Sequence, residues 1–287
     1  MNSPFRWYGG KKYFLKYLYP FPKHNIYVEL FGGSGVVLLN KPQSPIEVYN
    51  DINNRLVNFF RVLQNQCEEL QYLCRFQGAI RHRGLFLKYR EPSTDTLEDA
   101  FRFFYCNRYS FSGLTDKYGV SDIITLDNSK DLVKSYWGII DKFTEISTRI
   151  KSVNFENKDF TKLIIQFDTP DTLFYADPPY VVGGEAYEKM IGNDSHWTFA
   201  HYHTLINMLK QISGKFILST DTTDLAEKSW NIEQIERINN FSNTTDTQNK
   251  RIVKPEYIIR NFNKKSMITQ SNRNQRTLTS LIKKKSV

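Results

Sequence analysis

The tetrapeptide Asp177-Pro178-Pro179-Tyr180 is the segment whose residue types point most directly to chemistry. Two consecutive prolines remove two N–H donors, so the carbonyl groups of the turn stay free to accept hydrogen bonds. An exocyclic amine is a suitable donor, because Asp177 and the Pro178 carbonyl can accept its two N–H groups while Tyr180 offers a face for base stacking. Two acceptors free the lone pair of a conjugated amine for attack on an electrophilic methyl group. The structural alternative is an ordinary Pro-Pro turn that ends a strand.

A glycine-rich turn, Phe31-Gly32-Gly33-Ser34-Gly35, and the later carboxylate of Asp51 form a second candidate site. No Gly-Lys-Ser/Thr follows the glycines, so the turn is not a P-loop. The glycines would let the backbone approach a ligand closely, and Asp51 could accept both hydroxyls of a ribose. An adenosine-containing ligand without a long phosphate chain fits. Tight packing of the turn and an N-cap role for Asp51 are the structural alternatives.

The elements that must position these residues alternate between strand and helix. Strands are predicted at residues 26–31, 46–49, 172–176 and 215–220. Helices are predicted from Val36, from Ile52 and at about 198–212, because apolar residues recur there at helical spacing. Successive strand–helix units favour an α/β fold with a parallel, doubly wound sheet, whose ligands lie at the carboxyl ends of the strands.

The alternation is lost between about residue 68 and residue 150, which predicts an inserted, mainly helical domain. Helical patterns cover Leu97 to Tyr105 and Leu132 to Ile150, on either side of the polar, turn-rich segment 107–125. We therefore expect two domains. The catalytic domain would consist of residues 1–65 and 151–287, and the insert of residues 66–150.

Four separated parts of the chain resemble the D12-class DNA adenine-N6 methyltransferases, the Dam-like enzymes of the alpha group. These parts are RWYGGK (6–11), VELFGGSG (28–35) with YNDIN (49–53) behind it, NRYSFSGL (107–114) and FYADPPY (174–180). They stand in the alpha-group order of cofactor motif, target-recognition insert and catalytic motif. Weaker matches are Lys158-Asp159-Phe160 and ILSTD at 217–221.

The resemblance implies a Rossmann-like, S-adenosylmethionine-dependent methyltransferase that acts, without a metal, on N6 of an adenine flipped out of double-stranded DNA. It implies catalytic roles for Asp177, Pro178 and Tyr180. The residues that match the family's cofactor site are Trp7, Lys11, Phe31, Gly32, Gly33, Gly35, Asp51, Asp159, Phe160 and Asp177. Without the resemblance, Trp7 and Phe160 would be interpreted as core aromatics.

The resemblance also places DNA recognition in the insert and the N-terminal segment. The candidate DNA-binding residues are Arg6, Asn107, Arg108, Tyr109 and Lys117. A basic and aromatic run from Arg75 to Arg90 suits phosphate contact, and a solvated helix face explains it about as well. After Leu114 the chain departs from the family, because Thr115–Val120 replaces the expected Arg- and Asn-rich continuation. GATC is therefore not assumed as the target.

The net charge of +9, from 39 Lys and Arg against 30 Asp and Glu, lies in one part of the chain. Residues 250–287 contain eleven basic residues and one acid, Glu256, so residues 1–249 sum to −1. We expect the basic segment to add non-specific affinity for DNA, because phosphate contacts supply such binding. A cognate restriction endonuclease would be a further partner, and the sequence does not decide whether one exists.

Other features of the composition restrict the class of protein. Three cysteines without a CxxC pair and the lack of a signal-peptide pattern favour a reduced, cytoplasmic protein. Apolar runs fall far below the roughly 18 residues of a membrane span, so we expect no membrane partner. The histidines and cysteines show no metal-ligand spacing.

Two rival functions stay open. A DNA-binding homologue without catalysis is disfavoured by the intact Asp177, Tyr180, Asp51 and Lys11. A methyltransferase for another conjugated amine, such as RNA adenine or cytosine N4, is disfavoured because those classes more often carry Asn or Ser in the place of Asp177.

Overall fold

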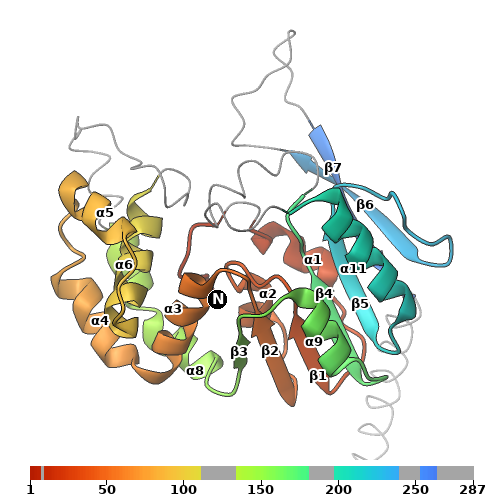
Figure 1. The fold of residues 1–287 in the computed structure, drawn as a ribbon, viewed down its shortest axis with the longest axis horizontal. Coiled ribbons are helices and arrows are strands. Elements are labelled where there is room, and N and C mark those ends of the chain that lie inside the picture. The colour runs from red at the N-terminus through yellow and green to blue at the C-terminus, as the bar shows by residue number, and fades with distance from the viewer. Residues whose placement is uncertain (8–9, 111–133, 181–196, 239–252, 264–287) are drawn as a thin grey trace, which may run out of the picture.

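The computed structural model describes residues 1–7, 10–110, 134–180, 197–238 and 253–263 (Figure 1). The segment Thr115–Val120, with the candidate Lys117 in it, lies outside the described residues. Of the basic segment 250–287, the structure describes residues 253–263, and the rest lies outside the described residues.

A seven-stranded sheet in the order β3-β2-β1-β4-β5-β7-β6 forms the centre of the molecule (Figure 1). The strands are β1 (Ile26–Glu29), β2 (Ile46–Asn50), β3 (Asn154–Glu156), β4 (Thr172–Ala176), β5 (Lys215–Thr220), β6 (Asn231–Ile238) and β7 (Val253–Arg260). The first five run parallel, whereas β7 pairs antiparallel with both β5 and β6. The predicted α/β, Rossmann-like architecture is confirmed.

Successive residues of the central strands pack on opposite faces of the sheet, because side chains alternate along a strand. Tyr27 and Tyr175 belong to the core on one face, and Val28 and Phe174 to the core on the other. All five residues of β4 are buried. Helices therefore cover both faces, as parallel sheets require.

Helices α1 to α3 pack on the Tyr27 face and helices α9 and α11 on the Val28 face. The helices are η1 (Lys12–Phe14), α1 (Leu15–Leu18), α2 (Val36–Asn40), α3 (Asn54–Asn65), α4 (Cys67–Phe76), α5 (Arg83–Arg90), α6 (Thr96–Tyr109), α8 (Phe143–Arg149), α9 (Phe160–Phe167) and α11 (Phe199–Gln211), and residues 134–140 are also helical. Side chains of Asn53, Asp95 and Asp159 cap α3, α6 and α9 by accepting backbone N–H bonds.

Two predicted boundaries were wrong. The strand expected at 26–31 ends at Glu29, although the Leu30 N–H still donates to the Tyr175 carbonyl oxygen. The segment 107–125 was expected to be turn-rich, but its first three residues form the last turn of α6. Tyr105 and Tyr109 lie one helical turn apart with ring centroids 4.7 Å from each other, and this contact extends the helix.

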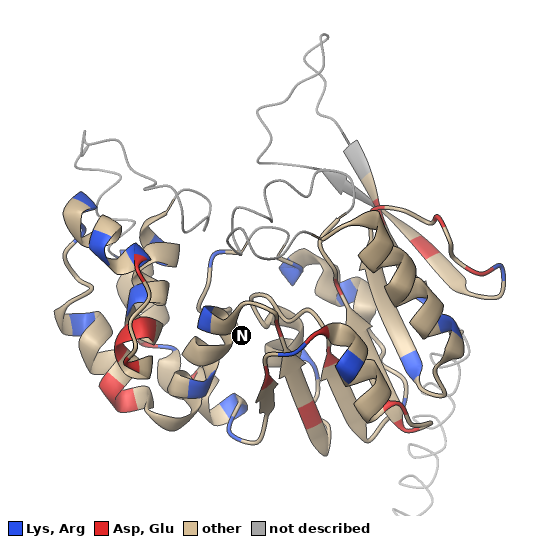
Figure 2. Ribbon diagram, viewed as in Figure 1, with Lys and Arg blue, Asp and Glu red and all other residues tan. Residues whose placement is uncertain are grey.

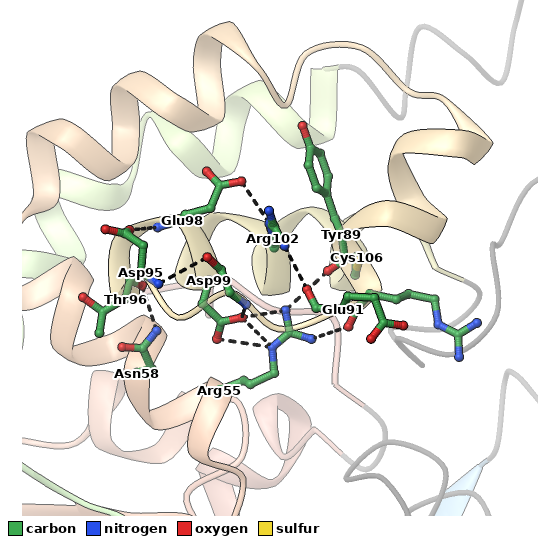
Figure 3. A network of polar contacts seen from close by, with 12 residues as sticks. Arg55, Asn58, Tyr89, Glu91, Asp95, Thr96, Glu98, Asp99, Arg102 and Cys106 are labelled. Atoms are coloured by element: carbon green, nitrogen blue, oxygen red, sulfur yellow. Dashed lines mark hydrogen bonds and ion pairs between the residues drawn. The ribbon is translucent and has the colours of Figure 1, made fainter.

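The insert packs against α3 rather than standing apart from the catalytic domain. On the α3 side, Arg55 donates to the Asp99 carboxylate and to the carbonyl oxygen of Arg90, and Asn58 donates to the carbonyl oxygen of Thr96 (Figure 3). The aromatic rings of Phe59 and Phe104 stack behind this network, and one hydrophobic core runs through both regions. The orientation of the insert is thus fixed by polar and apolar contacts to α3.

A second anchor lies where β2 begins, and we call Lys41, Glu47 and Arg149 the Glu47 cluster. Glu47 pairs with Lys41 and, through both carboxylate oxygens, with Arg149 of α8 at 2.6 and 3.0 Å. The Arg149 guanidinium also donates to the Leu38 carbonyl oxygen. Burial acts to raise the pKa of Glu47, but hydrogen bonds from Arg149 and Lys41 bring that pKa below its ordinary value.

Candidate active site

The predicted site residues gather where the parallel strands end. The glycine turn follows β1, Asp51 follows β2, and Asp177-Pro178-Pro179-Tyr180 follows β4. Because β2, β1 and β4 are neighbours in the sheet, these three segments meet at its carboxyl edge. This is the edge at which doubly wound sheets bind ligands.

Lys11 joins this edge from the segment before η1 and is almost fully buried. Its ammonium nitrogen lies 3.1 Å from Asp177 Oδ1, 2.5 Å from the Tyr180 hydroxyl and 3.6 Å from Glu256 Oε2. Glu256 belongs to β7, and both of its oxygens accept from the Tyr13 hydroxyl at 3.2 Å. We call Lys11, Asp177, Tyr180 and Glu256 the Lys11 cluster.

The surroundings of the Asp177 carboxyl bring its pKa toward neutral pH. Burial raises the pKa of Asp177 to about 6, with a smaller raising effect from Glu256, while Lys11 acts to lower it. Burial, together with Asp177 and Glu256, also raises the pKa of Tyr180, so its hydroxyl stays protonated. The arrangement combines a buried carboxylate acceptor, an aromatic face and a cation.

The glycine turn has a conformation that glycine favours, and it receives protein side chains. Gly33 and Gly35 have φ of +49° and +67°. A Cβ at Gly33 would lie 2.6 Å from Trp7 Nε1, and one at Gly32 would lie 2.1 Å from the Tyr49 ring. The tight-packing interpretation therefore holds for this turn, alongside any approach of a ligand.

Asp51 is buried directly after β2. Its two oxygens accept from the backbone N–H groups of Gly33 at 2.8 Å and Asn53 at 2.9 Å. Burial raises the pKa of Asp51 to about 6 despite these two hydrogen bonds. Each oxygen keeps a further lone pair, so the carboxylate can still accept ribose hydroxyls. Asn53, not Asp51, is the N-cap of α3.

Three aromatic rings lie together beside the glycine turn. Phe31 lies 5.4 Å from Phe160 and 5.2 Å from Trp197, centroid to centroid, and Phe160 lies 5.7 Å from Trp197. The Trp197 Nε1 atom is buried and has no hydrogen-bond partner among the described residues. A purine would find stacking surfaces and an available donor here. The neighbouring Asp159 accepts from the Thr161 N–H as the cap of α9.

Among the candidate DNA-binding residues that the structure describes, Arg6 lies in the N-terminal segment, and Asn107, Arg108 and Tyr109 lie in the last turn of α6. The Asn107 side chain is fully buried, accepts from the Arg6 N–H at 3.0 Å and donates to the Arg6 carbonyl oxygen at 2.8 Å. The Tyr109 hydroxyl is buried and donates to the Gly78 carbonyl oxygen. Direct base contact by Asn107 and Tyr109 stays a prediction that requires these hydrogen bonds to break. Asn107 instead holds the segment that carries Arg6 and Lys11.

Arg108 lines a cavity of about 470 Å³ between the N-terminal segment and residues 134–140. Lys12 and Lys142 also line this cavity, and no Asp or Glu does so among the described residues. Arg108 donates to Ser135, and burial, with a smaller effect of Arg6, lowers its pKa to about 10. In the described part of the chain, no carboxylate pairs with this buried cation. Figure 2 shows further Lys and Arg residues on the insert helices.

Sequence reasoning missed Glu256 and Tyr13 as parts of this site. Glu256 was noted only as the acid of a basic segment, and that isolation was the available signal. Among the described residues, no group of three His, Cys, Asp or Glu could hold a metal ion, and the metal-free mechanism stays a prediction. No described helix is both long and apolar enough to span a bilayer.

The sequences of several known proteins align with most of this chain. A protein of Lactococcus lactis subsp. cremoris named Type II methyltransferase M1.LlaDCHI is 28% identical over 258 residues, which cover 80% of this chain and 86% of that protein. The DNA N-6-adenine-methyltransferase of Escherichia phage P1 is 27% identical over 72% of this chain, and Modification methylase StsI of Streptococcus sanguinis is 23% identical over 93%. The chain spans 28% and 44% of the length of these two longer relatives.

A family model for D12 class N6 adenine-specific DNA methyltransferases matches residues 7–244. The match includes the glycine turn, the insert and the segment after β4, all of which the structure brings to one edge of the sheet or beside it. By this match, which extends over most of its length, the chain belongs to the D12 class of N6 adenine-specific DNA methyltransferases.

Proposed function

We propose that the protein uses S-adenosylmethionine to methylate N6 of an adenine that is flipped out of double-stranded DNA. The observation that carries this proposal is the Lys11 cluster at the carboxyl edge of the sheet, where Asp177 and Tyr180 lie beside the glycine turn and Asp51. When bound, S-adenosylmethionine supplies an electrophilic methyl group.

The residues fit an adenosine-bearing cofactor. The Asp51 carboxylate has lone pairs for ribose hydroxyls, and the Phe31–Phe160–Trp197 cluster offers stacking surfaces with an unpartnered Nε1 donor. The Trp7 ring lies against Gly33 of the turn. The cofactor would be held by Asp51, Phe31, Phe160 and Trp197. Asp159 would contribute by capping α9, the helix that begins with Phe160.

The target amine would be held by acceptors and a ring. Asp177 and the Pro178 carbonyl would each accept one N–H of the adenine amine, and Tyr180 would stack on the base. The nitrogen lone pair would then form the new C–N bond while the methyl–sulfur bond breaks. A carboxylate with a pKa of about 6 is suited to take the proton that the nitrogen loses.

Arg6 and Arg108 are our candidates for contacts with DNA. A buried guanidinium that faces a cavity lined by no carboxylate of the described residues suits a phosphate oxygen, because burying an uncompensated cation is costly. Lys12 and Lys142 extend the same positive lining. Arg6, held through its backbone by Asn107, would reach a base edge or a phosphate.

Incubation of the purified protein with labelled S-adenosylmethionine and unmethylated plasmid DNA tests this function. We expect label in DNA, recovered as N6-methyladenine by mass spectrometry, at one sequence that modified-base sequencing identifies. Recovery of label only in RNA or in N4-methylcytosine would favour the other amine substrates. Cofactor binding without any transfer would favour the inactive homologue.

The relatives named as type II or modification methylases support a narrower proposal, that methylation protects DNA from a cognate restriction endonuclease. Plasmid DNA methylated by this protein should resist an endonuclease that cuts the identified sequence. Cleavage of fully methylated DNA by every such endonuclease would contradict this role and leave the methyl transfer itself unaffected.

A further inference from the structure

Glu256 contacts Lys11 as Asp177 does, although the two acids are 79 positions apart in the chain. The Glu256 side chain is 3% exposed and its Oε2 lies 3.6 Å from the Lys11 ammonium nitrogen, which lies 3.1 Å from Asp177 Oδ1. β7 brings Glu256 there because it pairs with β5, the neighbour of β4. The ammonium group is therefore shared between a partly exposed carboxylate, Asp177, and a buried one, Glu256.

Sharing of one cation has a consequence for the strength of Asp177 as an acceptor. A carboxylate that holds an ammonium group alone is well neutralised and accepts further hydrogen bonds weakly. A second carboxylate draws part of that positive charge away and adds a like charge nearby, which strengthens the first as an acceptor and as a base. Tyr13 steadies the second carboxylate by donating to both Glu256 oxygens.

We propose that Glu256 is a positioning residue for methyl transfer, which holds Lys11 between two carboxylates so that Asp177 stays available to the target amine. This inference rests on the proposed function. It adds β7 to the catalytic machinery, beside the segments after β1, β2 and β4.

The charged and titratable groups around Asp177 support this role. Lys11 lowers the pKa of Asp177, Glu256 raises it and Ser219 of β5 lowers it slightly. On the neighbouring strands, Glu29 of β1 and Tyr175 of β4 are coupled to Asp177, and burial raises the pKa of both. The Glu29 pKa of about 8 leaves it neutral at pH 7. Besides Asp177, Glu256 is the acid that the described structure pairs with Lys11.

The test is the pH profile of single-turnover methyl transfer to plasmid DNA by the full-length protein and its Glu256→Gln variant. We expect the acidic limb of the profile to move toward lower pH by about one pH unit, because a like charge is lost beside Asp177. The plateau rate should fall about tenfold, as for impaired acid–base catalysis, with the KM for DNA nearly unchanged. Glu233→Gln in the adjacent β6 is the matched control and should leave the limb in place.

Glu256→Asp keeps the charge but moves it away from Lys11, so its limb should lie between those of the wild type and Glu256→Gln. If circular dichroism shows that Glu256→Gln does not fold, the limb of Glu256→Asp alone tests the inference. An unshifted limb in Glu256→Asp and in folded Glu256→Gln, or an equal shift in Glu233→Gln, would overturn the inference. A wild-type protein that transfers no methyl group would instead contradict the proposed function.

Discussion

The Lys11 cluster and the Glu47 cluster both hold buried charged side chains, yet they balance charge in opposite ways. In the Lys11 cluster, one ammonium group serves the two carboxylates of Asp177 and Glu256, and the pKa of Asp177 is raised to about 6. In the Glu47 cluster, two cations serve one carboxylate, whose pKa is lowered. The first lies at the carboxyl edge of the sheet and the second at the start of β2.

The difference in charge balance matches a difference in role: the Lys11 cluster is suited to bind and react with a substrate, and the Glu47 cluster to stabilise the fold. The Glu47 carboxylate pairs with two cations, so it holds α8 to the sheet and has few free lone pairs for a ligand. The Asp177 carboxylate shares its one cation with Glu256, so its charge is only partly neutralised and it remains a strong hydrogen-bond acceptor. The side chain of Asp177 is also 19% exposed, against 1% for Glu47, so a substrate can reach only the former.

The largest expected effect comes from removing the acceptor of the Lys11 cluster. Asp177→Ala should lower the rate of methyl transfer about 1,000-fold, because an acceptor aimed at the reacting amine is lost. The free energy of unfolding should change little, since Lys11 keeps Glu256 as a partner. Single-turnover transfer to plasmid DNA and urea denaturation measure the two quantities. A variant with intact transfer would remove Asp177 from the mechanism.

The corresponding change in the Glu47 cluster should act on stability instead. Glu47→Ala leaves Lys41 and Arg149 buried without their carboxylate, which should lower the free energy of unfolding by about 3–5 kcal/mol. Glu145→Ala, which removes an exposed partner of Lys142 in the same helix as Arg149, is the control and should cost about 0.5 kcal/mol or less. Equal losses in the two variants would contradict this assignment.

The pH dependence of kcat should follow the Lys11 cluster. The pKa of Asp177 is about 6, and only the ionised form can take the proton of the amine, so kcat should fall about tenfold per pH unit below pH 6. Burial gives Asp51 a similar pKa, so the KM for S-adenosylmethionine should rise over the same range. Rates at saturating cofactor separate the two effects. A flat kcat between pH 5 and 8 would refute the protonation argument.

Glu29, which is buried and accepts from the Tyr27 hydroxyl, should make the stability of the fold depend on pH. Its folded pKa is about 8 against 4.5 ordinarily, so between these values only the folded state keeps the proton and stability falls as pH rises. Glu29→Gln should lose this slope, which is at most about 1.4 kcal/mol per pH unit. Urea denaturation at pH 5 and 8 measures it, and parallel curves for both proteins would exclude the effect.

Local patterns predicted the parallel part of the sheet and the segments at its edge. β1, β2, β4 and β5 are short apolar runs followed by polar or glycine turns, and burial on both faces produces that pattern. The positions of Asp51 and of the turn after β4 follow directly from the ends of these strands. Cofactor and catalytic candidates therefore came together as expected.

The parts that sequence could not predict depend on contacts between distant segments. β7 contains Lys254 and Arg260 and lies in a basic segment, so nothing local distinguished Glu256 from a solvated acid. Its role appears only when β7 pairs with β5. Asn107 is similar, because its polar side chain suggested a surface until the structure paired it with the Arg6 backbone. The spacing of Phe101, Tyr105 and Tyr109 was the overlooked sign that α6 continues.

The insertion of β7 between β5 and β6 also orders events during synthesis. β1, β2, β4 and β5 leave the ribosome before β7 does, and domains generally fold from the N-terminal side as the chain emerges. A nascent chain can therefore assemble its glycine turn and Asp177 while Lys11 has a single carboxylate partner. On our proposal, full activity then requires the arrival of β7, because only β7 supplies the second carboxylate partner of Lys11.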